Sequence, residues 1–250
     1  MQLAAALSDG TMMIEADVSA GEDGQPIMAH PPDTQSDLSL DLFLETVLQA
    51  TEGGAKKGIK LDFKSLDILQ PSLETLQRLE ARLVFPVWLN ADILRGPGGK
   101  DPVSAEIFLQ LCSRYLPSAT LSTGFTTGSG EGEYSEEMME ELYQTMTNSG
   151  LTAPVTIPLR AALAARSGQE ILSYLARVEH TITLWGGATD QVDLQLLYQL
   201  VRDVGADRVY VDVPFQYDPP PLPTQRQTRQ LHNFLINSIS SALSLFASIL

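Results

Sequence analysis

Acidic residues and a lysine occupy alternate positions in two apolar, strand-like runs of the sequence. MMIEADV carries Glu15 and Asp17, and GIKLDFK carries Asp62 and Lys64. Because alternate residues of a strand face the same side, each run places its charged residues together on one face. Carboxylate oxygens without thiol neighbours suit Mg²⁺, with Ca²⁺ as the alternative, rather than zinc. We therefore predict that Glu15, Asp17 and Asp62 bind a metal ion. Lys64 would offer its charge to a phosphate oxygen beside that ion.

A histidine follows the first of these runs after a short glycine-containing loop. His30 lies in QPIMAHPP, directly before two prolines. Such a histidine is usually a plain loop residue, but an imidazole near a metal-bound phosphate can give or take a proton near neutral pH. Its spacing from Glu15 and Asp17 makes His30 the candidate acid–base residue.

Further strand-like runs carry polar side chains on the same alternation. PVWLNAD holds Asn90 and Asp92, PVTIPLR ends at Arg160, and TITLWGG holds Trp185. Burying many charges is costly unless they pair or bind a ligand, so we predict that these four residues contact a substrate. The alternative is a structural ion-pair network, such as one between Lys64 and Asp62.

The strand-like runs alternate with helical patterns, which predicts βαβ units and a parallel sheet. The helical patterns are LDLFLETVLQA, SAEIFLQLCSRYL, SEEMMEELYQTM, QEILSYLARV and VDLQLLYQLVRDVG. The strand-like runs are residues 12–18, 58–64, 86–92, 119–125, 154–160, 181–187 and 208–214.

Seven runs are one fewer than an α/β barrel of the (β/α)8 type requires. The opening QLAAALSDG reads as the end of a helix that should follow a first strand. We therefore predict a TIM-type barrel that lacks its first strand, as a short isoform, a shortened chain or a misplaced start codon would produce. The alternative is a sheet that is open or has seven strands.

Composition limits the classes of partner. The chain has 250 residues, 44% of them hydrophobic, and a formal net charge of −15. This length and apolar content suit a single α/β barrel. The acidic charge repels phosphate backbones, so we expect no nucleic acid partner. The single cysteine, Cys112, fits a buried thiol.

The two ends of the sequence differ in character. MQLAAALSDGT lacks the basic region and the long apolar stretch of a signal peptide. NFLINSISSALSLFASIL is apolar and serine-rich, and it follows the proline-rich DPPPLP. It is short for a membrane span, so we predict an amphipathic helix, with membrane contact through this tail as the alternative. The expected division is a barrel over residues 1–217 and a tail over residues 218–250.

Several blocks of the sequence resemble the menorin family, the family-with-sequence-similarity proteins. They are MIEADV, QPIMAHPP, KGIKLDFKS, PVWLNADIL, TTG, PVTIPLRAAL and TLW, and they span most of the chain. That family in turn resembles, more distantly, the glycerophosphodiester phosphodiesterase and spider-toxin phospholipase D barrels. The resemblance implies that the Glu-x-Asp of the first run and the carboxylate of Asp62 bind Mg²⁺. It also matches Lys64, His30 and, more loosely, Trp185 to residues of those enzymes.

The resemblance also exposes a gap. Those enzymes work with two histidines, the first at the end of the first strand, and this sequence has none before His30. A phosphodiester such as a glycerophosphodiester or a lysophospholipid headgroup would be the substrate, but whether this chain is a working enzyme stays open. The alternative implied by the family is a non-catalytic secreted or cell-surface factor with adhesion or receptor partners in neuronal patterning. An extracellular location follows from the resemblance, whereas the lack of a signal peptide keeps a cytoplasmic form open.

Overall fold

Seven parallel strands follow one another around a single sheet in the computed structural model, which describes residues 2–8 and 10–213. An eighth, short strand lies antiparallel beside the first, so the order across the sheet is β2-β1-β3-β4-β5-β6-β7-β8. The parallel strands are β1 (Met13–Ala20), β3 (Gly58–Phe63), β4 (Val87–Arg95), β5 (Thr120–Thr126), β6 (Val155–Arg160), β7 (Thr181–Trp185) and β8 (Val209–Asp212). Each of them coincides with a predicted run, so the α/β class is confirmed.

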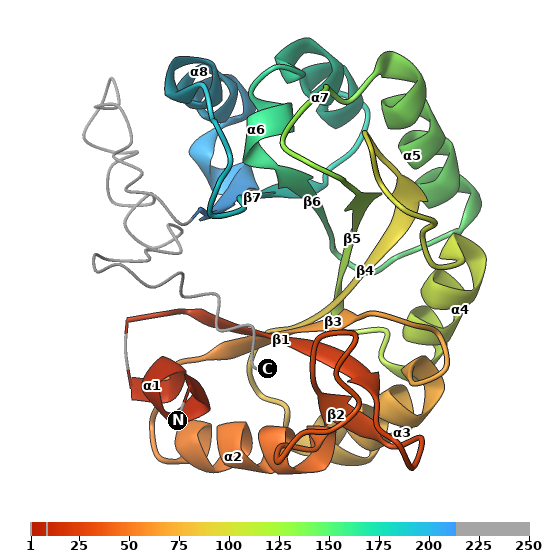
Figure 1. Ribbon diagram of the computed structural model, residues 1–250, viewed down its shortest axis with the longest axis vertical. Coiled ribbons are helices and arrows are strands. Elements are labelled where there is room, and N and C mark those ends of the chain that lie inside the picture. Colours follow the sequence, from red (N-terminus) through yellow and green to blue (C-terminus); the bar gives the residue numbers. More distant parts are fainter. Residues whose placement is uncertain (1, 9, 214–250) are drawn as a thin grey trace.

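Helices cover the outside of the curled sheet and form an arc around it (Figure 1). Four of them begin at a side-chain cap, because Ser39, Ser104, Ser135 and Asp193 each accept a hydrogen bond from a backbone N–H of the first turn. The helices are α1 (Gln2–Ser8), α2 (Leu40–Glu52), α3 (Leu69–Leu79), α4 (Ala105–Tyr115), α5 (Glu136–Asn148), α6 (Ala161–Ala164), α7 (Gly168–Leu175) and α8 (Leu194–Val204), with 3₁₀ turns at Glu80–Arg82 and Ala206–Arg208.

Three elements are absent from the sequence-based expectations, and one of them is the four-residue helix α6. The strand β2 (Pro26–Met28) pairs with the end of β1, with Val18 opposite Met28. Three residues are too few to show an alternating pattern. Helix α3 contains Pro71, which hides its helical pattern. A proline is tolerated there because the N–H groups of a first helical turn have no partner within the helix.

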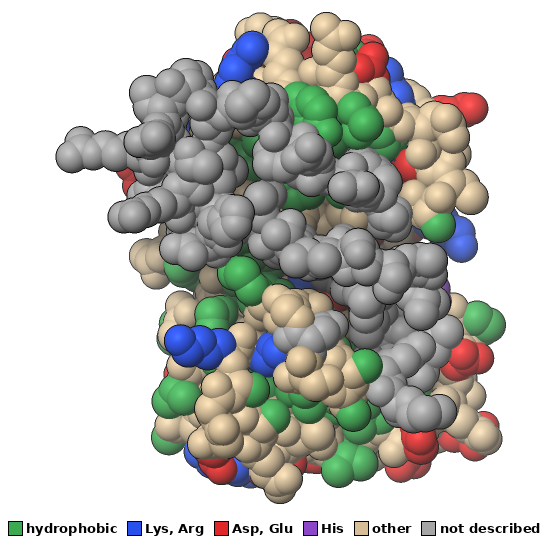
Figure 2. Space-filling model, turned by 90° about the vertical axis from the view of Figure 1, so that its left-hand side faces the viewer, with side chains coloured by type: hydrophobic (Ala, Val, Ile, Leu, Met, Phe, Trp, Pro, Cys, Tyr) green, Lys and Arg blue, Asp and Glu red, His purple; other side chains and the backbone are tan. Residues whose placement is uncertain are grey.

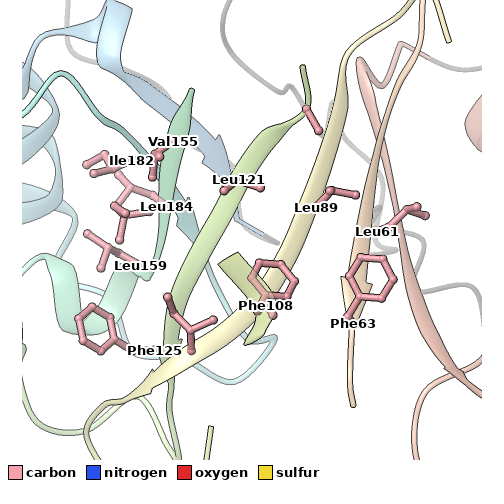
Figure 3. Close-up of a cluster of buried hydrophobic side chains, with 14 of the residues drawn as sticks. Leu61, Phe63, Leu89, Phe108, Leu121, Phe125, Val155, Leu159, Ile182 and Leu184 are labelled. Carbon is pink, nitrogen blue, oxygen red and sulfur yellow. The ribbon is translucent and has the colours of Figure 1, made fainter. Parts of the chain in front are cut away.

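The apolar parity of the strands packs outward against the helices, as the alternation predicts. Figure 3 shows Leu61, Leu89 and Leu121 on three neighbouring strands, with Phe63 of β3 beside Phe108 of α4. The centroids of these two rings lie 6.3 Å apart. This packing leaves the polar parity on the inner face, so the chemistry-bearing side chains point into the curl of the sheet.

The sheet curls so far that β8 and the N-terminal end of β1 lie on the same side of the molecule (Figure 1). Across the interior, Trp88 of β4 meets Tyr210 of β8 edge to face, with ring centroids 4.8 Å apart. Within residues 2–8 and 10–213, no strand pairs with both β8 and β1, so this part of the chain forms an open, barrel-like sheet. The absence of a first strand remains a prediction.

Figure 2 views the side on which β8 and the N-terminal end of β1 lie, and its described surface mixes hydrophobic side chains with basic and acidic ones. Along the described part of the chain, no helix is long and apolar enough to cross a membrane. The predicted tail, residues 218–250, lies outside the described residues, as does the end of the predicted barrel domain.

Candidate functional site: an acidic cluster with two lysines

Charged side chains from four strands gather on the inner face of the sheet. We call them the inner cluster. The strand register places Glu15 opposite Lys60, Asp17 opposite Asp62, and Asp62 opposite Asn90. The inner cluster consists of Glu15, Asp17, Lys60, Asp62, Lys64, Asp92 and Asp212. Most of these residues lie in the C-terminal halves of their strands or just beyond them, which is the end where parallel barrels build their sites.

Lys64 joins two of the predicted metal ligands. Its Nζ lies 2.8 Å from Asp17 Oδ1 and 2.6 Å from Asp62 Oδ2. Burial opposes the charged ammonium, but the neighbouring carboxylates of Asp62 and Asp17 raise the pKa of Lys64 nevertheless. The ammonium therefore stays charged, and the two carboxylates converge on one point.

Asp62 is the best-supported carboxylate of the cluster. Asn90 Nδ2 donates to Asp62 Oδ1 at 2.8 Å, and Ser122 Oγ donates to Asn90 Oδ1 at 2.7 Å. Burial favours the protonated form, yet Lys64 and Lys60 together with these hydrogen bonds lower the pKa of Asp62. Asn90 was predicted to touch substrate. In the structure it orients Asp62, and its substrate contact remains a prediction.

Lys60 is a member of the cluster that sequence reasoning did not assign to the site. Its Nζ lies 3.1 Å from Glu15 Oε1, and both side chains are largely buried. Burial raises the pKa of Glu15, and the Lys60 charge only partly opposes this. The sequence pattern could have identified Lys60, because it lies two residues before Asp62 in β3 and therefore faces the same side of the sheet.

Two carboxylates of the cluster accept no hydrogen bond from any described residue, namely those of Asp92 and Asp212. Asp92 is an exposed residue by its accessible surface, yet the surrounding protein and the charge of Asp62 raise the pKa of its carboxyl to about 7. Burial and the charge of Glu15 raise the pKa of Asp212 well above its usual range. Asp212 is the last residue of β8, and sequence reasoning assigned it no role.

His30 lies on the exposed loop beyond β2, near Asp17. Burial raises the pKa of Asp17, whereas Lys64 and, to a smaller extent, His30 lower it. His30 Nδ1 is 2.7 Å from the carbonyl oxygen of Pro31. Because a carbonyl can only accept, Nδ1 must carry the proton, which leaves Nε2 of the neutral ring as an acceptor. The structure therefore places the predicted acid–base residue beside the cluster.

Arg160 and Trp185 lie together at the ends of β6 and β7. The Arg160 guanidinium is 5.2 Å from the centroid of the Trp185 ring. It also donates to both carboxylate oxygens of Asp190, at 2.8 and 2.6 Å, and to the Gly128 carbonyl at 2.6 Å. Most of its donors thus bind protein groups. Asp190 sits in a loop without a periodic pattern, so no sequence signal pointed to it.

The donor chemistry of the cluster fits a divalent cation of the Mg²⁺ or Ca²⁺ kind. Five carboxyl groups share two ammonium groups, and burial, with a further contribution from neighbouring carboxylates, raises the pKa of Glu15, Asp17, Asp92 and Asp212. Hard carboxylate oxygens are the ligands that such ions prefer. Among the described residues, no group of three or more Asp, Glu, His or Cys side chains is arranged so that it could already hold a metal ion. Asp17 and Asp62 converge instead on Lys64.

Comparisons with known proteins place the chain in a family. Residues 1–218 match the family model described as the Menorin N-terminal domain. The chain is 39% identical to human Protein FAM151B over 216 residues, which is 83% of this chain and 76% of that protein. Among solved structures it is similar to the Ignisphaera aggregans GH53 catalytic domain, with a TM-score of 0.44 and 12% identity over 84% of this chain and 75% of that one. The family model and the human relative agree: the chain belongs to the menorin family.

Proposed function

We propose that the inner cluster is a divergent, metal-dependent site of the phosphodiesterase type. Its substrate would be a phosphodiester, such as a glycerophosphodiester or a lysophospholipid headgroup. The observation that carries this proposal is the excess of carboxylates over ammonium groups on the inner face. A buried surplus of negative charge is costly unless a cation offsets it.

Glu15, Asp17 and Asp62 would hold Mg²⁺, or Ca²⁺ in its place. When bound, the ion would polarise a phosphoryl oxygen as a Lewis acid. Lys64 would hold a second phosphate oxygen, because its flexible stem can redirect the ammonium. Nε2 of His30 would take or give a proton at the edge of the cluster. Asn90 would keep Asp62 in orientation.

Cation binding and diester cleavage are tested separately on the full chain. Titration calorimetry with MgCl₂ and then CaCl₂ should show saturable binding, and Glu15→Gln should weaken it by about tenfold or more. Glu179→Gln is the matched control, because it makes the same substitution at an exposed residue just before β7. Phosphorus NMR with glycerophosphocholine and lysophosphatidylcholine then reports cleavage. An absence of binding with both ions would exclude the metal site.

The alternative function is that of a non-catalytic extracellular or cell-surface factor. One observation supports it: Glu15, Asp17 and Asp62 are each ion-paired to a lysine of the same chain, as in a structural network. Under this alternative, removing Lys60 or Lys64 would destabilise the fold, and neither ion would bind at millimolar concentration. A protein partner would then have to be sought on the outer surface.

A further inference from the structure

Lys64 occupies the point where two proposed metal ligands converge. Its Nζ is 2.8 Å from Asp17 Oδ1 and 2.6 Å from Asp62 Oδ2. Mg²⁺ holds its oxygen ligands at about 2.0–2.1 Å, so an ion that takes these two oxygens needs the space of the ammonium. Two cations cannot share that point, because their repulsion is strong in a partly buried site. Cation binding therefore requires Lys64 to move.

A displaced ammonium needs a new partner, because an unpaired charge in a protein interior is unfavourable by several kcal/mol. The strand register points to one. Asp62 opposite Asn90 is the last pair of β3 and β4, and Lys64 and Asp92 each follow that pair by two residues. We therefore expect their side chains to lie near each other at this edge of the sheet. Adjacent strands are about 4.8 Å apart, and the four-carbon lysine stem spans such a distance.

Asp92 is suited to receive the ammonium. None of the described residues donates a hydrogen bond to its carboxylate, whereas Asp17, Asp62 and Glu15 already have a lysine partner. Burial and Asp62 raise the pKa of Asp92 to about 7, and the nearby charge of Lys64 acts in the opposite direction. Asp92 thus lies within the electrostatic reach of Lys64 but is not paired with it.

We propose that Asp92 is the second partner of Lys64: when a divalent cation binds Asp17 and Asp62, the ammonium shifts to Asp92. This inference rests on the proposed metal site and makes Asp92 a positioning residue. Held by Asp92, the ammonium stays at the same edge of the inner face as the ion, where it can meet a phosphate oxygen. Asp92 then acts through Lys64 rather than as a ligand.

A double-mutant cycle of Lys64 and Asp92 tests the shift by titration calorimetry with MgCl₂ alone, at about pH 8, which lies above the pKa of Asp92 of about 7. Lys64→Met should bind Mg²⁺ about tenfold more tightly than the unaltered chain, because no ammonium has to be displaced. Asp92→Asn should weaken binding about tenfold in the presence of Lys64, because the displaced ammonium loses its acceptor. In the Lys64→Met background, Asp92→Asn should change the affinity much less.

Asp212→Asn is the matched control. It removes another carboxyl group of the inner cluster, which lies beside Glu15 and Lys60 rather than Lys64, so its effect should be equal with and without Lys64. If Asp92→Asn weakens binding by the same factor in both backgrounds, Asp92 acts only through its charge and the shift is wrong. If neither the unaltered chain nor Lys64→Met binds Mg²⁺, the proposed metal site itself fails. Should Asp92→Asn not fold, Asp92→Ser supplies the same cycle.

Discussion

At the scale of single residues, the charged groups of the inner face compete for few partners. Lys64 forms ion pairs with both Asp17 and Asp62, and Lys60 forms an ion pair with Glu15. Asp92 and Asp212 are left with no hydrogen-bond donor among the described residues, and burial raises the pKa of both. Each residue's protonation therefore depends on the partners that its neighbours have already taken.

Asp92 should make stability depend on pH. Its pKa is about 7 in the folded protein and about 4 in an unfolded chain, so between these values the folded state binds more protons. The free energy of unfolding should therefore fall as the pH rises from about 4 to about 7. The charged groups acting on Asp92 from neighbouring elements are Asp62, Lys64, Lys60 and Glu15, and Tyr134 is a further titratable neighbour.

Asp92→Asn should make this decline shallower without abolishing it, because the pKa values of Glu15, Asp17 and Asp212 are raised as well. Denaturant unfolding across a pH series measures the change. Asp67→Asn, at an exposed residue just beyond β3, should leave the curve as it was. An unchanged slope in Asp92→Asn would show that Asp92 ionises in the usual range.

A glycine on the inner face sets the spacing between β5 and β6. A Cβ on Gly124 would lie 2.6 Å from Pro158 Cγ and 2.8 Å from the Pro158 carbonyl oxygen. Gly124→Ala should destabilise the protein by about 1–3 kcal/mol, because backbone has to move. Gly168→Ala is the matched control, since nothing lies within 4 Å of its Cβ. A similar midpoint of unfolding for both variants would contradict the contact.

At the scale of elements, an ion pair ties the end of β6 to the loop between β7 and α8. The Arg160 and Asp190 side chains are 11% and 2% exposed, and Asp190 Oδ2 also accepts from the Gly187 N–H at 2.9 Å. Arg160 reaches the loop after β5 as well, through the Gly128 carbonyl. Three loops at the site end of the sheet are thereby held together.

Removal of Asp190 should release this connection. Asp190→Ala leaves the Arg160 guanidinium without its carboxylate, which typically costs about 3–5 kcal/mol in a buried pair. The Gly187 amide should also exchange faster with solvent, because it loses its acceptor. Asp203→Ala removes a carboxylate from the more exposed pair with Arg202 and should change stability by less than about 1 kcal/mol. Equal losses would argue against the connection.

At the scale of the whole molecule, the curl of the sheet depends on contacts across its interior. Trp88 and Tyr210 join β4 to β8, which are not neighbours in the sheet. The Lys60 charge acts on Asp212, and so does that of Glu15, so the two ends of the sheet interact electrostatically as well. The inner cluster therefore combines residues of β1 and β3 with Asp212 of β8, on the other side of an open sheet.

Tyr210→Leu tests this arrangement. Loss of the ring contact should destabilise the protein by about 0.5–1.5 kcal/mol beyond the lost area. Hydrogen exchange should accelerate in β8 more than in β4 or β5, which have a strand on each side. Uniform acceleration along the chain would mean that the contact supports global stability rather than the position of β8.

The alternation of polar and apolar residues explains how much of the fold and of the inner cluster could be predicted from the sequence. A period of two is a property of a few successive residues, so it revealed the parallel strands and placed Glu15, Asp17, Asp62 and Asp92 on the inner face. It could not reveal β2, whose three residues are too short for a pattern, nor α3, whose pattern is interrupted by Pro71.

The sequence by itself determined the seven parallel strands, their arrangement as a parallel sheet and which of their side chains face inward. Only the tertiary structure decided which side chains contact one another on that face. Lys64 reaches Asp17 and Asp62 because the register of β1 and β3 is set by packing along the whole sheet. Arg160 pairs with Asp190, and Trp88 with Tyr210, because the sheet curls and its loops fold back. Such pairings join residues far apart in the chain, and no local pattern encodes them.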